Sequence, residues 1–192
     1  MCWKWFRILG LIACFLAFQG CSDDSSDKIT DIDERVVDDT TIDDGNGTVT
    51  ANEDSSLPLA PNFTLVSTAL EEVSLNDHHG KVVLVDFWAT WCKPCEEEIP
   101  IFIELYDQYR GQGFEVLGIS LDDGGLKVVE PFIERLGVNY TVLLGAPEIS
   151  QKYDIPAMPS AFLIDRDGRI VKVFPGAQGK KATYESELKQ LL

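Results

Sequence analysis

The feature that most constrains the fold is a buried strand, a cysteine pair and a helix in direct succession. Val82–Trp88 reads VVLVDFW, a run of β-branched and aromatic residues typical of a strand that is buried on both faces. Cys92 and Cys95 follow, with two residues between them, and residues 96–109 carry apolar side chains at helical spacing. This succession predicts an α/β fold in which a central strand delivers two cysteines to the start of a helix.

The other elements follow from local patterns. Two alternating segments, 62–68 and 71–77, predict half-buried strands that form an N-terminal β-hairpin. Further strands are predicted at 114–120, 140–144, 160–165 and 169–176, the last two joined across an Arg-Asp-Gly turn, and further helices at 127–136, 148–153 and 184–192. The order β-β-β-α-β-α-β-α-β-β-α predicts a mixed sheet covered by helices on both faces.

Acidic residues are concentrated ahead of this domain. The chain has 192 residues and a formal net charge of −16, and residues 22–56 hold twelve acidic side chains against two basic ones, with no aromatic residue. Low hydrophobicity with high net charge does not offset the entropy lost on ordering, so 21–56 is predicted to be an acidic disordered tether, with an acidic docking tail as the alternative. Such a charge opposes binding to nucleic acid. Residues 57–192 are then one compact domain with room for a core.

The first twenty residues predict a secretory signal. Lys4 and Arg7 are basic, and the apolar stretch that follows, 8–20, has 13 residues where a membrane-spanning helix needs about 20. The stretch ends at Gly20, and Cys21 follows it. This sequence resembles the lipobox of bacterial lipoproteins, in which the cysteine is lipidated and becomes the mature N-terminus. Residues 1–20 are therefore predicted to be a signal peptide of the lipoprotein type.

Lipidation is expected at Cys21. Cys14, which ends a rival LIAC sequence, is the alternative. Cleavage there would leave too short an apolar region in the signal and a further apolar stretch after the cleavage site. An uncleaved short anchor is a third possibility. Ser22 follows Cys21, which by resemblance to enterobacterial sorting favours the outer over the inner membrane. The predicted location is the bacterial cell envelope, lipid-anchored and facing the periplasm. Because the other N-terminal cysteines leave with the signal, Cys92 and Cys95 are the only cysteines of the folded domain.

The cysteine pair has two structural interpretations. A zinc site needs four ligands, yet the chain has one CxxC pair and two histidines, His78 and His79, which are adjacent and on a strand would point to opposite faces. We therefore expect no metal and no cofactor, and we expect both histidines in a solvated turn. A structural disulfide between Cys92 and Cys95 would close a very small loop and add little stability.

A redox-active pair has a clear physical basis. Cys92 is placed at the N-terminus of a helix, where free N–H groups and the helix dipole stabilise a thiolate and lower the pKa of the thiol. Lys93 adds a neighbouring positive charge, and Pro94 suits the first helical turn because it has no N–H to lose. Cys92 is thus predicted to be the exposed attacking thiolate, and Cys95, deeper in the helix, to resolve the mixed disulfide.

The proton of Cys95 needs an acceptor. Asp86 is the candidate, because a carboxylate inside an apolar strand has a raised pKa that suits proton transfer near neutral pH; its alternative is a strand-end residue facing solvent. The three glutamates at 96–98 are interpreted as stabilising the helix N-terminus rather than as catalytic residues. Pro100 falls inside the helix and should kink it.

Residues 81–95, KVVLVDFWATWCKPC, closely resemble the active-site strand and turn of the TlpA/ResA-type exported thiol–disulfide oxidoreductases, which have a thioredoxin-like fold. The segment 153–165, YDIPAMPSAFLID, resembles the part of that family that bears its cis-proline. The resemblance gives this role to Pro159 and implies that the backbone of Met158 pairs with the substrate chain. It covers residues 58–192.

The resemblance also implies further roles, and the chain departs from the family pattern at two positions. One is Ser160, which replaces a commoner Thr and is expected to have no consequence. Residues 127–153 correspond to the helix and strand that the TlpA/ResA group inserts into a minimal thioredoxin. Trp88 and Trp91 match the motif, and both are expected to shape the contact surface around Cys92, with ordinary packing as the alternative, above all for Trp88. Asp86 departs from the family pattern, because many members have Asn there, so its proton chemistry is expected to be closer to that of general thioredoxins.

The family implies a thiol:disulfide oxidoreductase, most directly a protein-disulfide reductase that serves cytochrome c maturation by reducing apocytochrome c. Such a reductant needs electrons from a membrane donor of the CcdA/DsbD type, which an outer-membrane anchor would make difficult to reach. The direction of electron flow stays open, because reductases, oxidases and isomerases share these residues.

Two other functions are weighed against this one. A peroxiredoxin-like thiol peroxidase of the AhpC/TSA type carries a PxxxTxxC pattern, which fails here because position 85 is Val and Thr90 lies two residues before Cys92. A non-catalytic lipoprotein that only binds a partner is opposed by the intact CxxC.

Overall fold

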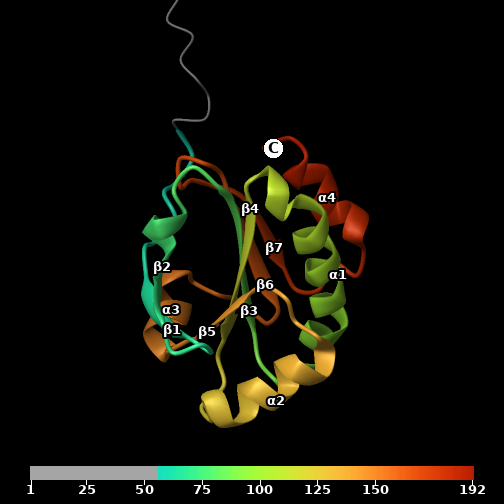
Figure 1. Cartoon of the computed structure of the whole chain (residues 1–192). Helices are drawn as coiled ribbons and strands as arrows, with labels where there is room; N and C mark the ends of the chain where they lie inside the picture. The colour runs from blue at the N-terminus through green and yellow to red at the C-terminus, as the bar shows by residue number, and fades with distance from the viewer. Residues whose placement is uncertain (1–55) are drawn as a thin grey trace, which may run out of the picture. The chain divides into compact units, whose positions relative to one another are not determined.

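Seven strands form one mixed sheet in the order β2-β1-β5-β4-β3-β6-β7 (Figure 1). The computed structural model describes residues 56–192; the signal peptide, Cys21 and almost all of the predicted tether lie outside the described residues. The strands are β1 (Thr64–Ser67), β2 (Glu72–Ser74), β3 (Val82–Trp88), β4 (Phe114–Ser120), β5 (Thr141–Leu144), β6 (Ser160–Ile164) and β7 (Ile170–Pro175). β3 pairs in parallel with β4 and antiparallel with β6, so the strand that leads to the cysteines lies inside the sheet.

Helices cover both faces of this sheet. The α-helices are α1 (Lys93–Tyr109), α2 (Leu126–Leu136), α3 (Pro147–Lys152) and α4 (Lys181–Leu188), with short 3-10 helices at Leu75–His78 and Arg110–Gln112. Residues of α1, α2 and α4 pack into one core cluster and Ile149 of α3 into the other. Figure 1 shows α1 and α4 together on one side, α3 on the opposite side and α2 across one end of the sheet. The predicted thioredoxin-like α/β fold and its element order are confirmed.

The alternation of β3 explains how one strand feeds two cores. All seven residues of β3 are buried. Val82, Leu84 and Trp88 belong to the core cluster beneath α1, whereas Val83, Val85 and Phe87 belong to the other cluster, as the period of two in a strand requires. The same alternation directs Asp86 toward the α1 side, between Leu84 and Trp88.

Several predicted boundaries move. The strand predicted at 71–77 ends at Ser74, because the backbone N–H of Ser74 donates to Asp77 Oδ2 over 3.0 Å and this cap starts a 3-10 helix. The first helix begins at Lys93 rather than 96, and it runs through Pro100 to Tyr109. The last helix is Lys181–Leu188 rather than 184–192. Gly137 ends α2 with a left-handed φ of 68°.

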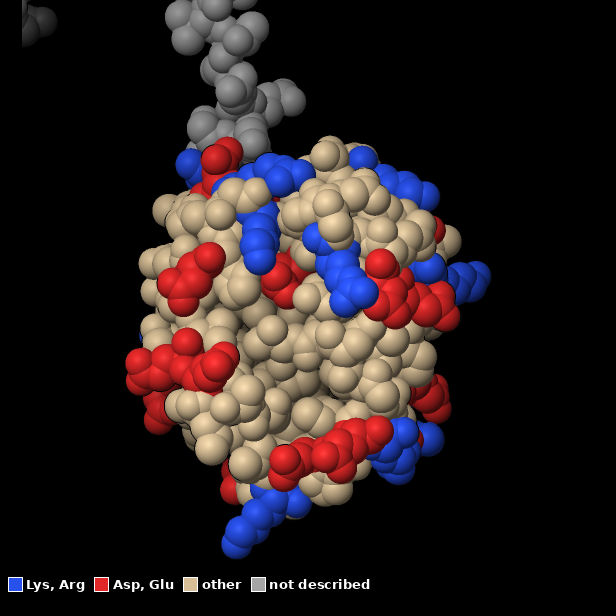
Figure 2. Space-filling view, in the orientation of Figure 1, with Lys and Arg blue, Asp and Glu red and all other residues tan. Residues whose placement is uncertain are grey.

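Charges of both signs are spread over the domain. On the face that Figure 2 shows, Lys and Arg side chains are interspersed with Asp and Glu around an uncharged central area. Across residues 56–192, no helix has the length and apolar character needed to cross a bilayer.

Candidate active site

Cys92 and Cys95 are joined in a disulfide, with their Cα atoms 5.3 Å apart. Cys92 is the N-cap of α1 and has an extended backbone, and its carbonyl accepts the first helical hydrogen bond, from Glu96 N, over 3.2 Å. Pro94 lies in the first turn, where its missing N–H costs nothing. The pair therefore sits at the positive end of the helix dipole, an environment that stabilises a thiolate once the disulfide is reduced.

The two sulfurs differ in accessibility. Cys92 is 6% exposed and Cys95 is 1% exposed, so the order matches the expectation, but the prediction of an exposed Cys92 is wrong for the disulfide form. Both residues belong to the core cluster that contains Trp88, and the half-buried Met158 packs against this cluster. Bonding to Cys95, one helical turn inside, keeps Cys92 against the core rather than in solvent.

Lys93 does not act as a free cation beside the pair. Its ammonium group lies 3.4 Å from Glu96 Oε2, and Arg135 Nη1 donates to Glu96 Oε1 over 2.8 Å. The hydrogen bond from Arg135, aided by the charge of Lys93, lowers the pKa of Glu96. Since the Lys93 side chain is largely exposed and paired, its expected influence on the Cys92 thiol is partly offset.

Asp86 is buried at the centre of β3, with 1% of its surface exposed, so the alternative of a solvent-facing strand end is wrong. Burial, and after it the charge of Glu98, raises the pKa of Asp86 well above its usual value. Its Oδ1 atom has no hydrogen-bond partner among residues 56–192. Because its pKa is raised, the ionised Asp86 carboxylate is a stronger base than a solvent-exposed one and is able to take up a proton inside the core.

Glu98 is buried in the core, so its interpretation as one of three charges that stabilise the helix N-terminus is wrong, and sequence reasoning missed its place in the site. Its side chain is 2% exposed, and its Oε1 accepts hydrogen bonds from the Tyr184 hydroxyl and, over 2.8 Å, from Gln178 N. Within the described chain its Oε2 has no hydrogen-bond partner. A signal was present, because Glu98 comes three residues after the buried Cys95 and so lies on the same helix face, one turn further on.

Two more buried polar side chains, those of Trp88 and Tyr140, lie next to Asp86. Gly118 is the residue opposite Asp86 in the β3–β4 pair, and a Cβ atom at Gly118 would lie 3.0 Å from both Trp88 Nε1 and Tyr140 Cε2. Burial raises the pKa of Tyr140 well above its usual value, and the charge of Asp86 raises it further. Together with Glu98, these groups make a polar region in the core behind the cysteine pair.

The Met158–Pro159 peptide bond is cis, as the resemblance implies for Pro159. Pro159 is buried, and its carbonyl accepts a hydrogen bond from Gly176 N over 2.8 Å. Ser160, the next residue, pairs with Phe87 across the β3–β6 ladder. The cis-proline segment therefore reaches the same end of β3 as the loop that carries the cysteines.

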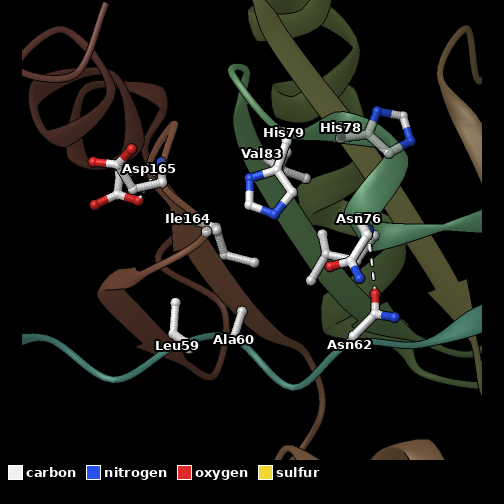
Figure 3. Close-up of a pocket in the computed structure, with 12 residues that line it drawn as sticks. Leu59, Ala60, Asn62, Asn76, His78, His79, Val83, Ile164 and Asp165 are labelled. Atoms are coloured by element: carbon white, nitrogen blue, oxygen red, sulfur yellow. Dashed lines mark hydrogen bonds between the residues drawn. The ribbon is translucent and has the colours of Figure 1, made fainter.

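A separate pocket of about 280 Å³ lies at the other end of β3, with Val83 in its lining and His79 pointing into it (Figure 3). Trp88 lies five positions after Val83, which at about 3.3 Å per residue is a distance of roughly 17 Å. This pocket therefore does not belong to the cysteine site. The prediction that both histidines are solvated holds for His79, whereas His78 is half-buried and burial lowers its pKa. In the described residues, no group of three or more His, Cys, Asp or Glu side chains could hold a metal ion.

Comparison with known proteins agrees with this geometry. The model of the AhpC/TSA family matches residues 58–173. The thiol-disulfide oxidoreductase ResA of Geobacillus thermodenitrificans is 37% identical over 123 residues, which cover 64% of this chain and 70% of that protein. ResA of Bacillus subtilis is 33% identical over 127 residues, covering 66% and 70%.

Solved structures are similar over the same region. A putative thiol:disulfide interchange protein DsbE from Chlorobium tepidum has a TM-score of 0.67 and 29% identity, covering 70% of this chain and 96% of its own. StoA from Bacillus subtilis has a TM-score of 0.58 and 25% identity, covering 68% and 98%.

Proposed function

Because the chain belongs to the AhpC/TSA family and, within it, to the thiol–disulfide oxidoreductases of the ResA type, we propose that it reduces the disulfides of other proteins in the bacterial cell envelope. The observation that carries the proposal is the Cys92–Cys95 pair at the N-terminus of α1, at the end of β3 with which the segment after the cis-proline also pairs. A pair so placed exchanges two electrons with a substrate disulfide.

In the proposed cycle, the Cys92 thiolate attacks one sulfur of the substrate disulfide and displaces the other, which takes up a proton. Cys95 then attacks Cys92, releases the substrate as a dithiol and restores the Cys92–Cys95 disulfide. The substrate gains two electrons and the pair loses two. Burial of Cys95 keeps its thiol from competing for the first attack.

Asp86 is proposed to accept the Cys95 proton before the second attack. Its buried carboxyl group has a raised pKa, and Glu98 adds a second buried carboxyl group to the same region. The charge of Glu98 raises the pKa of Asp86 beyond the effect of burial, which strengthens the Asp86 carboxylate as a base. This arrangement can hold or release a proton near the sulfurs without solvent.

Substrate binding is assigned to two surfaces. Trp91 is 69% exposed next to Cys92, and the Met158 backbone precedes the cis bond at Pro159. We propose that an extended segment of the substrate pairs with Met158 while its cysteine faces Cys92. Protein disulfides, apocytochrome c among them, fit such a surface better than small thiols do.

The location and electron supply complete the proposal. The signal peptide at 1–20, lipid on Cys21 and a tether at 21–56 would hold the domain at a membrane and facing the periplasm, the outer membrane being favoured by Ser22. A membrane donor of the CcdA/DsbD type would re-reduce the Cys92–Cys95 pair after each cycle, and an anchor in the outer membrane would make that donor difficult to reach.

The AhpC/TSA match leaves a peroxiredoxin-like thiol peroxidase as the second candidate. The arrangement around Cys92 weighs against it, because Cys92 is paired with Cys95 and lacks the Thr that the peroxidase pattern places three residues earlier. Consumption of hydrogen peroxide would distinguish the two activities.

The reduction potential of the Cys92–Cys95 couple tests the direction of electron flow. Residues 22–192, which contain all of the described structure, would be equilibrated with dithiothreitol and with glutathione. A potential of about −270 mV or lower supports a reductant, and a value near about −120 mV would make the protein an oxidant. A pair with no reversible couple would rule out both.

A further inference from the structure

The loop that carries Cys92 is held by a carboxylate from another part of the chain. Asp122 follows β4, and both of its oxygens accept hydrogen bonds from Thr90, two residues before Cys92. The Thr90 hydroxyl donates to Oδ1 over 2.6 Å and the Thr90 backbone N–H donates to Oδ2 over 2.9 Å. A carboxylate that accepts two bonds from one residue fixes the position of that residue as well as its distance.

Asp122 is itself held at the end of β4. The hydroxyl of Ser120, which is 1% exposed, donates to Asp122 Oδ2 over 2.9 Å, and Asp122 N donates back to the Ser120 oxygen over 3.2 Å. Leu121 N donates to the Trp88 carbonyl over 2.8 Å, which ties the ends of β3 and β4 together. The carboxylate is therefore a rigid support and not a mobile side chain that happens to meet the loop.

The network continues beyond β4. Gly145 N donates to the Ser120 carbonyl over 2.8 Å, and a Cβ atom at Gly145 would lie only 2.6 Å from that oxygen. Gly145 precedes α3, which leads into the cis-proline segment. Ser120, whose hydroxyl holds Asp122, thus also binds the connection that leads toward Pro159.

Asp122 positions the contact surface of the site, which Trp91 and Cys92 form. Trp91, between Thr90 and Cys92, is 69% exposed, so the core does not set the direction of its ring. Cys92 N donates to the Ala89 carbonyl over 3.1 Å, which makes residues 89–92 one tight turn. A turn held at Thr90 presents Trp91 and the Cys92 sulfur in one fixed arrangement.

We propose that Asp122 is a positioning residue of this oxidoreductase, whose carboxylate holds Thr90 so that Trp91 and Cys92 are presented together to the substrate protein. The inference rests on the proposed function and adds a determinant of substrate binding to it. The hydrogen bonds of Asp122 go to Thr90 and Ser120 rather than to the sulfurs, so its removal weakens docking more than it slows the exchange of electrons.

The test compares Asp122→Ala and Asp122→Asn with Asp123→Ala in residues 22–192. Asp123 is the adjacent acidic residue and is exposed, so this control makes the same change of charge in the same connection. Insulin is the protein disulfide substrate and dithiothreitol the reductant, and the rate that dithiothreitol gives alone is subtracted. Asp122→Ala is expected to raise KM about tenfold and to leave kcat within about twofold, as loss of charge-assisted hydrogen bonds predicts. Asp123→Ala is expected to match the wild type.

A second readout reports positioning directly. In residues 22–192 the tryptophans are Trp88, which is fully buried, and Trp91. Freeing the loop in Asp122→Ala is expected to lower the fluorescence anisotropy of Trp91, against a constant contribution from Trp88. This measurement needs no turnover, so it still tests the positioning role if the wild type fails to reduce insulin, an outcome that would contradict the proposed function alone.

Variants at Thr90 guard against misfolding at position 122. Thr90→Ser keeps the hydroxyl and is expected to retain the wild-type KM and anisotropy, whereas Thr90→Val loses the 2.6 Å bond and is expected to shift both toward Asp122→Ala. The proposal is overturned if Asp122→Ala equals Asp123→Ala in KM and anisotropy, if kcat falls while KM is unchanged, or if Thr90→Val behaves like Thr90→Ser.

Discussion

Glu98 on α1 raises the pKa of Asp86 on β3, and both carboxyl groups are buried in the core behind the Cys92–Cys95 pair. Each group has one oxygen without a hydrogen-bond partner within residues 56–192. A negative charge on Glu98 disfavours ionisation of Asp86, because two like charges would share a region with little solvent. The ionisation of Asp86 therefore depends on the charge of Glu98.

Asp86→Asn is expected to stabilise the fold at neutral pH by about 1–3 kcal/mol. The folded protein holds the Asp86 proton more tightly than the unfolded chain does, so wild-type stability falls as the pH rises above the usual value of 3.8 toward the raised pKa. Asn has no proton to lose there. The free energies of unfolding of the wild type and Asp86→Asn, measured with urea from pH 3 to pH 8, should meet at the acid end and separate as the pH rises. A difference between the two proteins that stays constant with pH would contradict the assignment.

The same substitution is expected to slow catalysis although it stabilises the fold. Without the Asp86 carboxylate, the Cys95 proton has no acceptor on β3, and the second attack should slow by about 10²-fold, the lower range of general-base effects. The mixed disulfide on Cys92 should therefore accumulate during turnover, where mass spectrometry under non-reducing conditions would detect it. Unchanged turnover in Asp86→Asn would assign the proton to another group.

Glu98→Gln is expected to lower the pKa of Asp86, because the neighbouring negative charge is removed. The amide oxygen can still accept the hydrogen bonds from Tyr184 and Gln178 N, so packing against α4 is retained. A carboxyl-carbon NMR titration of Asp86 measures the shift. Glu97→Gln, which removes an exposed charge one residue away, is the matched control and should leave the titration in place.

Cys95→Ser is expected to trap the substrate on Cys92 as a mixed disulfide, because the attack that would release it is lost. Cys92→Ser should form no such adduct, since the buried Cys95 is shielded from substrate. Multiple turnover should fall by at least about 10³-fold in both variants. Gel electrophoresis without reductant separates the two outcomes, and an adduct on Cys92→Ser would reverse the assigned roles.

Gly145→Ala is expected to destabilise the domain by about 1–3 kcal/mol, because the new Cβ would lie 2.6 Å from the Ser120 carbonyl oxygen and 2.8 Å from an Ile119 side-chain carbon. Gly111→Ala is the control, since a Cβ there meets nothing within 4 Å. Thermal unfolding of both variants gives the comparison. Equal midpoints would show that the β5–α3 connection moves aside without cost.

Much of the fold could be predicted because its signals are local. β3 and β4 match the predicted segments residue for residue, since an uninterrupted apolar run needs only its own length and composition to indicate a buried strand. The end of β2 was misplaced because a cap formed by Ser74 and Asp77 competes with strand geometry over a few residues. Boundaries of this kind depend on single hydrogen bonds, which a periodic pattern does not report.

The cysteine site divides in the same way. The sequence by itself determined the redox pair and its helix, because Cys92, Pro94 and Cys95 are neighbours whose chemistry depends on being at a helix N-terminus. Only the tertiary structure decided what surrounds them: the coverage of Cys92, and the partners of Asp86 and Thr90. Those partners, Glu98, Tyr140 and Asp122, come from other elements that meet at this end of the sheet because β4 lies between β5 and β3 and α1 packs across them. Side chains brought together by strand order and helix packing leave no mark in the local pattern, because each is chosen by contacts made far along the chain.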